Sequence, residues 1–158
     1  MRAWLRQKFW APLLSLLKHG LSPSKLAFSV ALGAWIALFP ALGVTTLLAL
    51  LAASIFRLNL VAVQIANYLC YPLQFLVLFP FFRAGEWLFN RVPLGLSPLE
   101  FVQFVTHNPA EAVRKYWTVT WDAAAVWLLL GLIVVPLVWL SLTPFFTRIA
   151  HRLEAKSA

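Results

Sequence analysis

Three long stretches of the chain contain no charged residue, and they limit what it can fold into. They run from Leu26 to Phe56, from Leu58 to Phe82 and from Ala123 to Thr147, and they are 31, 25 and 25 residues long. About 20 apolar residues are enough for a helix to cross the hydrocarbon core of a bilayer. No strand pattern accompanies them, so we expect an all-α integral membrane protein.

The overall composition also favours a lipid environment. Of the 158 residues, 62% are hydrophobic and 11% are charged, whereas soluble domains are roughly half apolar. A basic start before an apolar stretch is also typical of a secretory signal, whose apolar region spans about 7 to 15 residues. The first uncharged stretch is 31 residues long. We therefore expect it to be part of the membrane domain and not a cleaved signal.

No sequence pattern indicates an enzyme, a metal site or a bound cofactor. Cys70 is the single cysteine, and the histidines His19, His107 and His151 lie far apart, so neither a disulfide nor a zinc site is predicted. Nucleophile, phosphate-loop and kinase motifs are absent. The net charge of +8 comes without a nucleic-acid-binding motif. We expect anionic lipid headgroups, and no nucleic acid, as partners of the basic residues.

The charges separate into two basic ends and a neutral middle. Lysine and arginine predominate before Leu26 and after Thr147, whereas four basic and four acidic residues lie from Arg83 to Asp122. Because lysine and arginine collect in short cytoplasmic segments, we expect both termini on the cytoplasmic side of a bacterial inner membrane and the middle segment outside. This arrangement requires an even number of crossings, although three uncharged stretches are present.

A turn inside the first uncharged stretch resolves this conflict. As one helix its 31 residues would be about 46 Å long, half again the roughly 30 Å thickness of the hydrocarbon core. Pro40 interrupts the stretch and Gly43 follows closely, and proline removes a helical hydrogen bond. We expect a re-entrant hairpin with arms from Leu26 to Phe39 and from Ala41 to Phe56. One long, tilted helix with a proline kink is the alternative.

The chain therefore divides into five predicted segments. A serine or asparagine precedes a proline at three predicted helix starts, at Ser22, Ser97 and Asn108. The segments are a basic amphipathic interfacial segment (1–21), a membrane core with helix breaks at Pro40 and Pro72 (22–90), an extracytoplasmic interfacial loop with short helices (91–122), a transmembrane helix (123–147) and a basic cytoplasmic tail (148–158).

The predicted break at Pro40 is the first part of a candidate substrate-binding site. Pro40, Gly43, Thr45 and Thr46 place irregular backbone and two hydroxyl groups at membrane depth. Irregular backbone inside a bilayer is tolerated where it is buried in protein or lines a water-filled cavity, and broken helices form substrate sites in transporters. A structural kink whose threonines bond to their own helix is the alternative.

Polar residues in and beside the second uncharged stretch complete the candidate site. Arg57 and Asn59 either anchor a turn at the cytoplasmic interface or bind a phosphate or carboxylate. Further along, polar residues recur near one helical stripe, which serves either helix packing or a polar pathway. The candidates there are Asn67, Tyr71, Pro72 and Gln74.

A combination of these residues carries a family resemblance. It consists of Ser22 with Pro23, Phe39 and Pro40 with Gly43, Arg57 with Asn59, Pro72, and Gly85. The succession from Ser22 to Phe89, a little under half the chain, resembles the bacterial membrane family called domain of unknown function 2062. The resemblance implies a small inner-membrane protein with two intramembrane breaks, and no particular activity.

The chain departs from that family pattern at two positions. An asparagine commonly precedes the second proline and a threonine follows it at two residues' distance, whereas Tyr71 and Gln74 stand there in this chain. If those family residues bind a ligand, this chain binds it differently or not at all.

Two functions fit the sequence. The first is a membrane protein that binds or transports a small polar or lipid-linked substrate at the Pro40 break, where Arg57, Asn59 and Gln74 would converge on a hydrated cavity. The second is a membrane scaffold or accessory subunit that transports nothing, in which the same residues pack helices together. Both are compatible with a homo-oligomer, and neither requires an enzymatic activity.

Overall fold

The computed structural model describes residues 21–41, 43–93, 95 and 97–155. Within these residues the chain is helical and contains no strand, so the predicted all-α class is confirmed. The predicted interfacial segment lies almost wholly in residues 1–20, outside the described part. The helices are α3 (Pro23–Ala37), α4 (Thr45–Ile55), α5 (Leu60–Leu88), α6 (Pro98–His107) and α7 (Pro109–Glu154).

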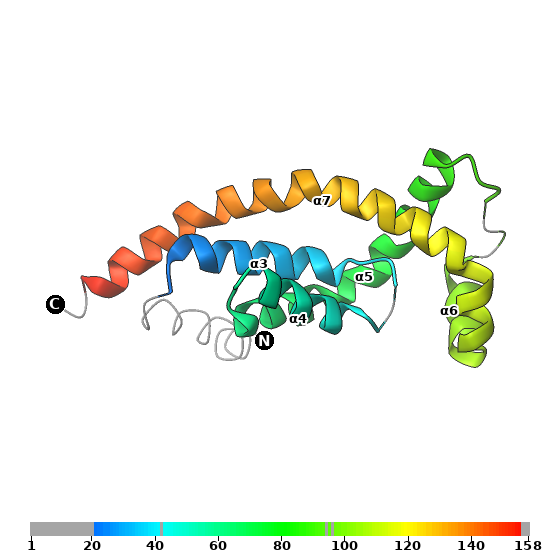
Figure 1. Ribbon diagram of the computed structural model, residues 1–158, viewed down its shortest axis with the longest axis horizontal. Coiled ribbons are helices and arrows are strands. Elements are labelled where there is room, and N and C mark those ends of the chain that lie inside the picture. Colours follow the sequence, from blue (N-terminus) through cyan, green and yellow to red (C-terminus); the bar gives the residue numbers. More distant parts are fainter. Residues whose placement is uncertain (1–20, 42, 94, 96, 156–158) are drawn as a thin grey trace.

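The first uncharged stretch forms a hairpin of two short helices. The Ser22 side chain caps α3 by accepting a hydrogen bond from the Lys25 backbone N–H, with Pro23 in the first turn, as predicted. The helix ends at Ala37, the chain turns at Pro40, and α4 then runs back beside α3 (Figure 1). The break at Pro40 is therefore confirmed, and the alternative of one kinked helix is wrong.

The end of α4 is a tight turn built on Arg57. Arg57 has a φ of +51°, its backbone N–H donates to Ser54 O, and the next N–H, of Leu58, donates to Ala53 O. This pair of bonds is the Schellman motif, in which glycine is usual at the left-handed position. Asn59 then caps α5, because its side-chain oxygen accepts from the Ala62 backbone N–H at 3.0 Å. The turn therefore passes directly from one helix into the next.

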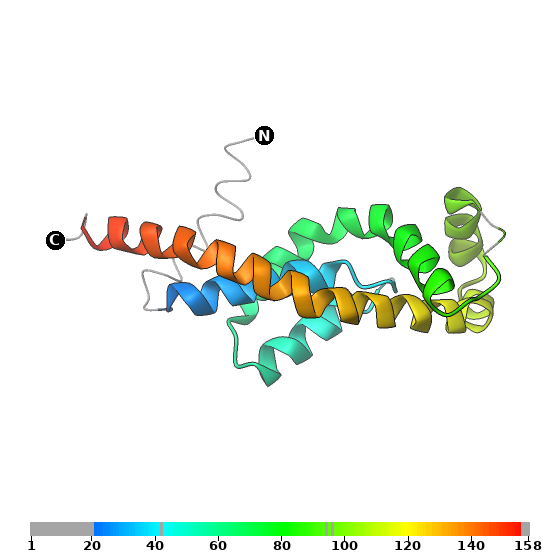
Figure 2. The same ribbon diagram turned by 90° about the horizontal axis from the view of Figure 1, so that it is seen from above.

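The second predicted break is wrong. The helix α5 continues through both Pro72 and Pro80 without interruption, and it follows a curved path (Figure 2). Proline removes one helical hydrogen bond and bends a helix, but a helix packed against neighbours can retain its course. Since α5 packs on both α3 and α7, these contacts hold the helix together across the two prolines.

The C-terminal half contains one short and one very long helix. The short helix α6 begins at the predicted start after Ser97, with a capping box in which the Glu100 carboxylate accepts from the Ser97 backbone N–H and hydroxyl. These hydrogen bonds lower the pKa of Glu100, so the cap is complete at neutral pH and is lost as the pH falls through that lowered value.

The long helix α7 extends across the predicted segment boundaries. It has 46 residues, corresponds to about 69 Å, and joins part of the predicted interfacial loop (91–122), the predicted transmembrane helix (123–147) and most of the tail in one element. The predicted boundary at residue 122 coincides with Asp122, the last charged residue before the third uncharged stretch. The helix continues through this position, where the Asp122 carboxylate pairs with Arg91.

The helix α3 lies between α7 on one side and α4 and α5 on the other (Figure 1). Two indole groups fix α7 along it. Trp127 Nε1 donates to Trp35 O at 3.1 Å near the end of α3, and Trp139 Nε1 donates to Ser24 O at 3.1 Å near its start. The two bonds set the position of α7 along α3.

Glycines allow close approach where α3 meets α5, where α5 meets α7 and where a tryptophan of α3 meets α7. A Cβ atom on Gly33 of α3 would lie 2.3 Å from Val63 O of α5, and one on Gly85 of α5 would lie 2.8 Å from Ala123 N of α7. On α7, a Cβ atom on Gly131 would lie 2.3 Å from Trp35 Nε1. Small residues at crossings are typical of membrane helices, because hydrocarbon offers no hydrophobic drive for association and close packing replaces it.

Two of the described helices are long and apolar enough to cross a membrane. By length and composition, these are Leu60–Leu88 and Ala110–Arg152, whereas Thr45–Ile55 is a shorter apolar helix. Large hydrophobic side chains are exposed along both candidates, including Leu76 of α5 and Leu132 of α7.

The contact at Gly33 yields a test of this packing. In Gly33→Ala, the methyl group would meet the Val63 carbonyl, and neither backbone can move without separating α3 from α5. We expect the free energy of unfolding to fall by about 1–3 kcal/mol, despite the better helix propensity of alanine. Thermal unfolding of the purified protein measures this. Gly95→Ala, where a Cβ atom meets nothing within 4 Å, is the control. An unchanged or higher unfolding temperature for Gly33→Ala would contradict the close contact.

Candidate functional site

The chain reverses at Pro40 in a turn that α5 holds closed. The Ala41 N–H donates to Phe39 O across Pro40 at 2.8 Å, and the proline is fully buried. From α5, Gln74 Nε2 donates to Phe39 O at 2.6 Å and to Ala41 O at 3.0 Å. Because both partners are acceptors, the Gln74 amide must present its nitrogen to the turn. Gln74 is fully buried, so this contact lies in the interior of the protein.

Beyond the turn, the start of α4 carries no side-chain cap. Gly43 has a φ of +84°, a conformation that favours glycine, and Val44 occupies the cap position without a side-chain hydrogen bond. Thr45 is buried and Thr46 is exposed. The two hydroxyl groups therefore face different environments.

The remaining predicted site residues do not meet at this turn. Arg57 and Asn59 follow the far end of α4, which is 11 residues or about 16 Å long, and Arg57 is exposed. Asn59 is occupied as the cap of α5. The predicted convergence of Arg57, Asn59 and Gln74 on one hydrated cavity is therefore not present in the described residues.

The predicted polar stripe of α5 is partly buried in the protein and partly exposed. Asn67 is fully buried, and its Nδ2 donates to Gln64 Oε1 at 3.3 Å. Tyr71 is half-buried and makes an edge-on contact with Phe75, while Pro72 is exposed. The side-chain oxygens of Asn67 and Gln74 have no hydrogen-bond partner among the described residues. Asn67 and Gln74 thus face the helix contacts, and the stripe does not form a continuous polar path.

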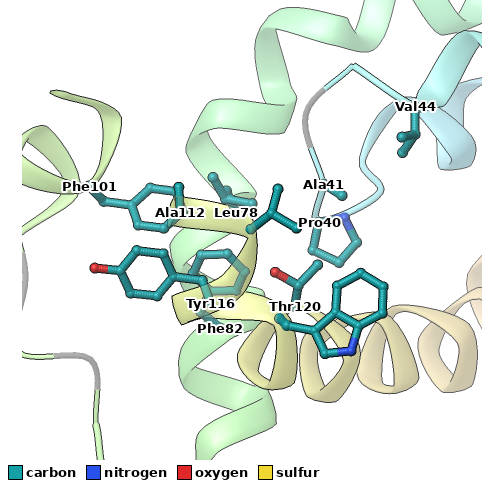
Figure 3. A pocket seen from close by; sticks show the side chains of 11 residues that line it. Pro40, Ala41, Val44, Leu78, Phe82, Phe101, Ala112, Tyr116 and Thr120 are labelled. Carbon is teal, nitrogen blue, oxygen red and sulfur yellow. The ribbon is translucent and has the colours of Figure 1, made fainter. Parts of the chain in front are cut away.

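A cavity of about 360 Å³ lies beside the Pro40 turn (Figure 3). We call it the Pro40 pocket. The turn forms one wall, α5 the back, and α6 with the start of α7 the remaining walls. Its lining is mostly aliphatic and aromatic: Pro40, Ala41, Val44, Leu78, Phe82, Phe101, Ala112, Val113, Tyr116, Trp117 and Thr120.

Most of these walls were not found by sequence reasoning. Phe101, Tyr116 and Trp117 belong to the segment that was predicted as an interfacial loop. Phe101 packs on Phe82 and Tyr116 packs on Phe101, so this wall depends on contacts distant in sequence. The sequence feature that could have indicated the pocket is the high density of aromatic residues in that segment. Aromatic residues also mark membrane interfaces, so the signal did not distinguish a pocket from an anchor.

A cation lies over the ring of Tyr116, one of the residues that line the Pro40 pocket, although it is not itself a lining residue. Lys115 Nζ is 5.2 Å from the centre of the Phe104 ring and 5.7 Å from that of Tyr116, which lines the pocket. Such cation–π contacts hold an ammonium group in place without neutralising it. The pocket therefore combines an apolar interior with a positive charge nearby. No group of three or more potential metal ligands occurs among the described residues.

The hydrogen bonds from Gln74 can be tested by substitution. Gln74→Leu keeps a similar volume and removes both bonds to the Pro40 turn, leaving Ala41 O without a partner. We expect a loss of about 1–3 kcal/mol in unfolding free energy, and faster hydrogen exchange of the amides at the turn and the start of α4. Gln103→Leu, at an exposed glutamine of α6, is the control. Unchanged exchange at the turn would show that Gln74 does not hold it.

Comparison with known proteins places the chain in a family. No curated protein and no solved structure matches it significantly. A family model described as "Uncharacterized protein conserved in bacteria (DUF2062)" matches residues 6–158. That match extends the resemblance seen at Ser22 to Phe89 over nearly the whole sequence, including the helices that form the pocket. The chain therefore belongs to the DUF2062 family of bacterial proteins.

Proposed function

We propose that this chain is an integral protein of the bacterial inner membrane that binds an anionic lipid or lipid-linked molecule in the Pro40 pocket. In this proposal α5 and α7 cross the bilayer, and α3 and α4 form a re-entrant hairpin. The observation that carries the binding role is the Pro40 pocket itself, with apolar walls and with Lys115 over the ring of the lining residue Tyr116.

The exposed surface of the two long helices supports the membrane location. In their most apolar stretches, 33% of the residues of α5 and 28% of those of α7 are buried inside the protein. A core helix of a water-soluble protein would be mostly buried, whereas most residues of these stretches keep at least part of their surface accessible. Transferring that surface to water would be strongly unfavourable, since each Å² of apolar surface contributes about 25 cal/mol. Lipid is the solvent that suits it.

Helix lengths and charges support the re-entrant hairpin. The helices α3 and α4 have 15 and 11 residues, or about 22 and 16 Å, so each is shorter than the roughly 30 Å hydrocarbon core. The start of α3, the end of α4 and the end of α7 lie toward one end of the molecule (Figure 1). Lys25, Arg57, Arg148 and Arg152 belong to these segments, which fits a cytoplasmic end facing anionic headgroups.

The shape and chemistry of the pocket favour a hydrocarbon chain as its occupant. Val44, Val113 and Trp117 line the pocket and are themselves exposed, so its opening is flanked by the surface that we assign to lipid. An acyl or isoprenoid chain could enter from the bilayer without crossing water. The ammonium group of Lys115 would attract a phosphate on such a molecule. An uncharged or cationic lipid would lack this second interaction.

The proposal is for binding, without an aqueous transport path and without catalysis. A polar substrate would require polar groups that converge on water, but Gln74 is used in closing the turn and Arg57 lies beyond the other end of α4. The walls of the pocket offer hydrocarbon and aromatic surface instead.

A scaffold role is the second candidate, and the glycine crossings favour it specifically. The contacts at Gly33, Gly85 and Gly131 produce a tightly packed helix group whose outer faces remain apolar. Such faces could pack against a second copy of the chain or another membrane helix. In that case lipid would coat the protein without selective binding in the pocket.

Filling the pocket distinguishes these candidates. In Thr120→Trp the indole would occupy the pocket from a half-buried position, and Leu132→Trp adds the same group on an exposed face of α7. We expect the amount of retained phosphatidylglycerol, measured by native mass spectrometry of the folded protein, to fall about tenfold in Thr120→Trp, equivalent to about 1.4 kcal/mol. The control should be unchanged.

The same measurement of lipid retention tests the role of the Lys115 charge. Lys115→Ala should reduce retention of phosphatidylglycerol and leave that of phosphatidylcholine at its parental level, because only the former carries a net charge. Equal lipid retention in the parent, Thr120→Trp and Lys115→Ala would contradict selective binding and favour the scaffold role.

A further inference from the structure

A second cavity lies at the C-terminal end of α5 and has a different chemistry. Its volume is about 420 Å³, and we call it the Arg91 cavity. In contrast to the Pro40 pocket, charged and amide side chains predominate in its lining. The residues are Arg83, Glu86, Trp87, Asn90, Arg91 and Pro93.

The backbone at this end of α5 is held in a defined conformation. Asn90 has a φ of +51°, its N–H donates to Trp87 O, and the Arg91 N–H donates to Glu86 O at 2.8 Å. This is again a Schellman motif, with asparagine at the left-handed position that it tolerates well. The side chains of Trp87, Asn90 and Arg91 are thus presented from a short, fixed segment.

Two buried carboxylates orient the arginines. Arg83 Nη1 donates to Glu86 Oε2 at 3.0 Å, and Arg91 Nε donates to Asp122 Oδ2 at 3.0 Å. The side chains of Glu86 and Asp122 are 4% and 10% exposed, whereas those of the arginines are about half exposed. Arg91 uses its Nε alone in the hydrogen bonds among the described residues, so its two terminal NH₂ groups are left as donors.

The charges at the cavity argue against an ion as its ligand. Two guanidinium groups and two carboxylates sum to zero, which neither attracts nor repels a charged molecule at a distance. The C-terminal end of a helix carries a partial negative charge of about half an elementary charge, and this disfavours an anion such as phosphate. A neutral molecule with many hydrogen-bonding groups is better matched, because the cavity offers both donors and acceptors.

Trp87 provides an exposed aromatic ring in the lining of the Arg91 cavity. Its side chain lines the cavity, and the residue is 81% exposed although it is one of the largest apolar residues. The C–H face of a pyranose ring packs on an indole ring, while its hydroxyl groups reach planar polar side chains at the ring edge. We propose that the Arg91 cavity binds a neutral sugar ring, with Trp87 as the stacking platform and Asn90 and Arg91 as hydrogen-bonding groups.

This inference is independent of lipid binding in the Pro40 pocket, since none of the residues is shared. The sugar could be a free saccharide or the headgroup of a glycolipid, because both present the same ring. Saturation-transfer difference NMR can detect either one. The full-length protein in phosphatidylcholine nanodiscs would be probed with methyl α-glucoside and with N-acetylglucosamine.

Three variants locate the binding. Trp87→Ala should reduce the sugar signal at least tenfold, and Asn90→Gly, which keeps the left-handed backbone, should reduce it several-fold. Trp121→Ala removes a comparable exposed tryptophan that does not line the cavity and should leave the signal unchanged. A glucosyl lipid in the nanodisc that competes with the free sugar identifies a headgroup, and failure to compete identifies a soluble saccharide.

Three results would overturn the inference. They are a sugar signal no higher than that of empty nanodiscs, an equal loss in Trp87→Ala and Trp121→Ala, or binding of inorganic phosphate where neither sugar binds. Phosphate binding would assign the cavity to an anion. It would show that attraction by the two arginines outweighs repulsion by the partial negative charge at the C-terminal end of α5.

Discussion

The hydrogen bonds from Gln74 to the Pro40 turn join α5 to the α3–α4 hairpin. Phe39 O and Ala41 O lie at a helix break, where backbone acceptors without partners would be costly in an apolar environment. One amide group from α5 satisfies both at 2.6 and 3.0 Å. The turn can therefore be buried against α5, and α4 can run back beside α3. Because the turn lies next to α6 and α7, it also forms one wall of the Pro40 pocket.

The same interaction argues against a polar substrate site at the turn. Gln74 was a candidate ligand of a polar substrate, but its donor group is already occupied by the protein's own backbone. Arg57 and Asn59 shape the turn at the other end of α4 and do not converge with Gln74. Beside the Pro40 turn lies a mostly apolar pocket, with the Lys115 cation over one of its lining rings. This combination suits a lipid-linked anion better than a molecule that is fully hydrated.

Much of the fold could be predicted from local signals, and the site could not. Ser22, Ser97 and Pro40 act on their own helix ends, so the helix starts and the first break are readable from the sequence. The effect of Pro72 depends on whether neighbouring helices support α5, and the partner of Asp122 in α7 is Arg91, which is 31 positions away in the sequence. The pocket joins residues up to 80 positions apart, from Pro40 to Thr120, and no local pattern specifies such contacts.

The central claim is that the α3–α4 hairpin returns the chain to the side from which it entered. Cysteine accessibility in intact cells tests this, with Cys70 replaced by serine and single cysteines placed at Lys25, Ser54 and Gly95, which are exposed in the structure. The account predicts that the cysteines at Lys25 and Ser54 are labelled only by a reagent that enters the cytoplasm. The one at Gly95 should be labelled by an impermeant reagent from outside. Labelling of the Ser54 cysteine by the impermeant reagent would show that the first uncharged stretch crosses the membrane, and it would contradict the hairpin.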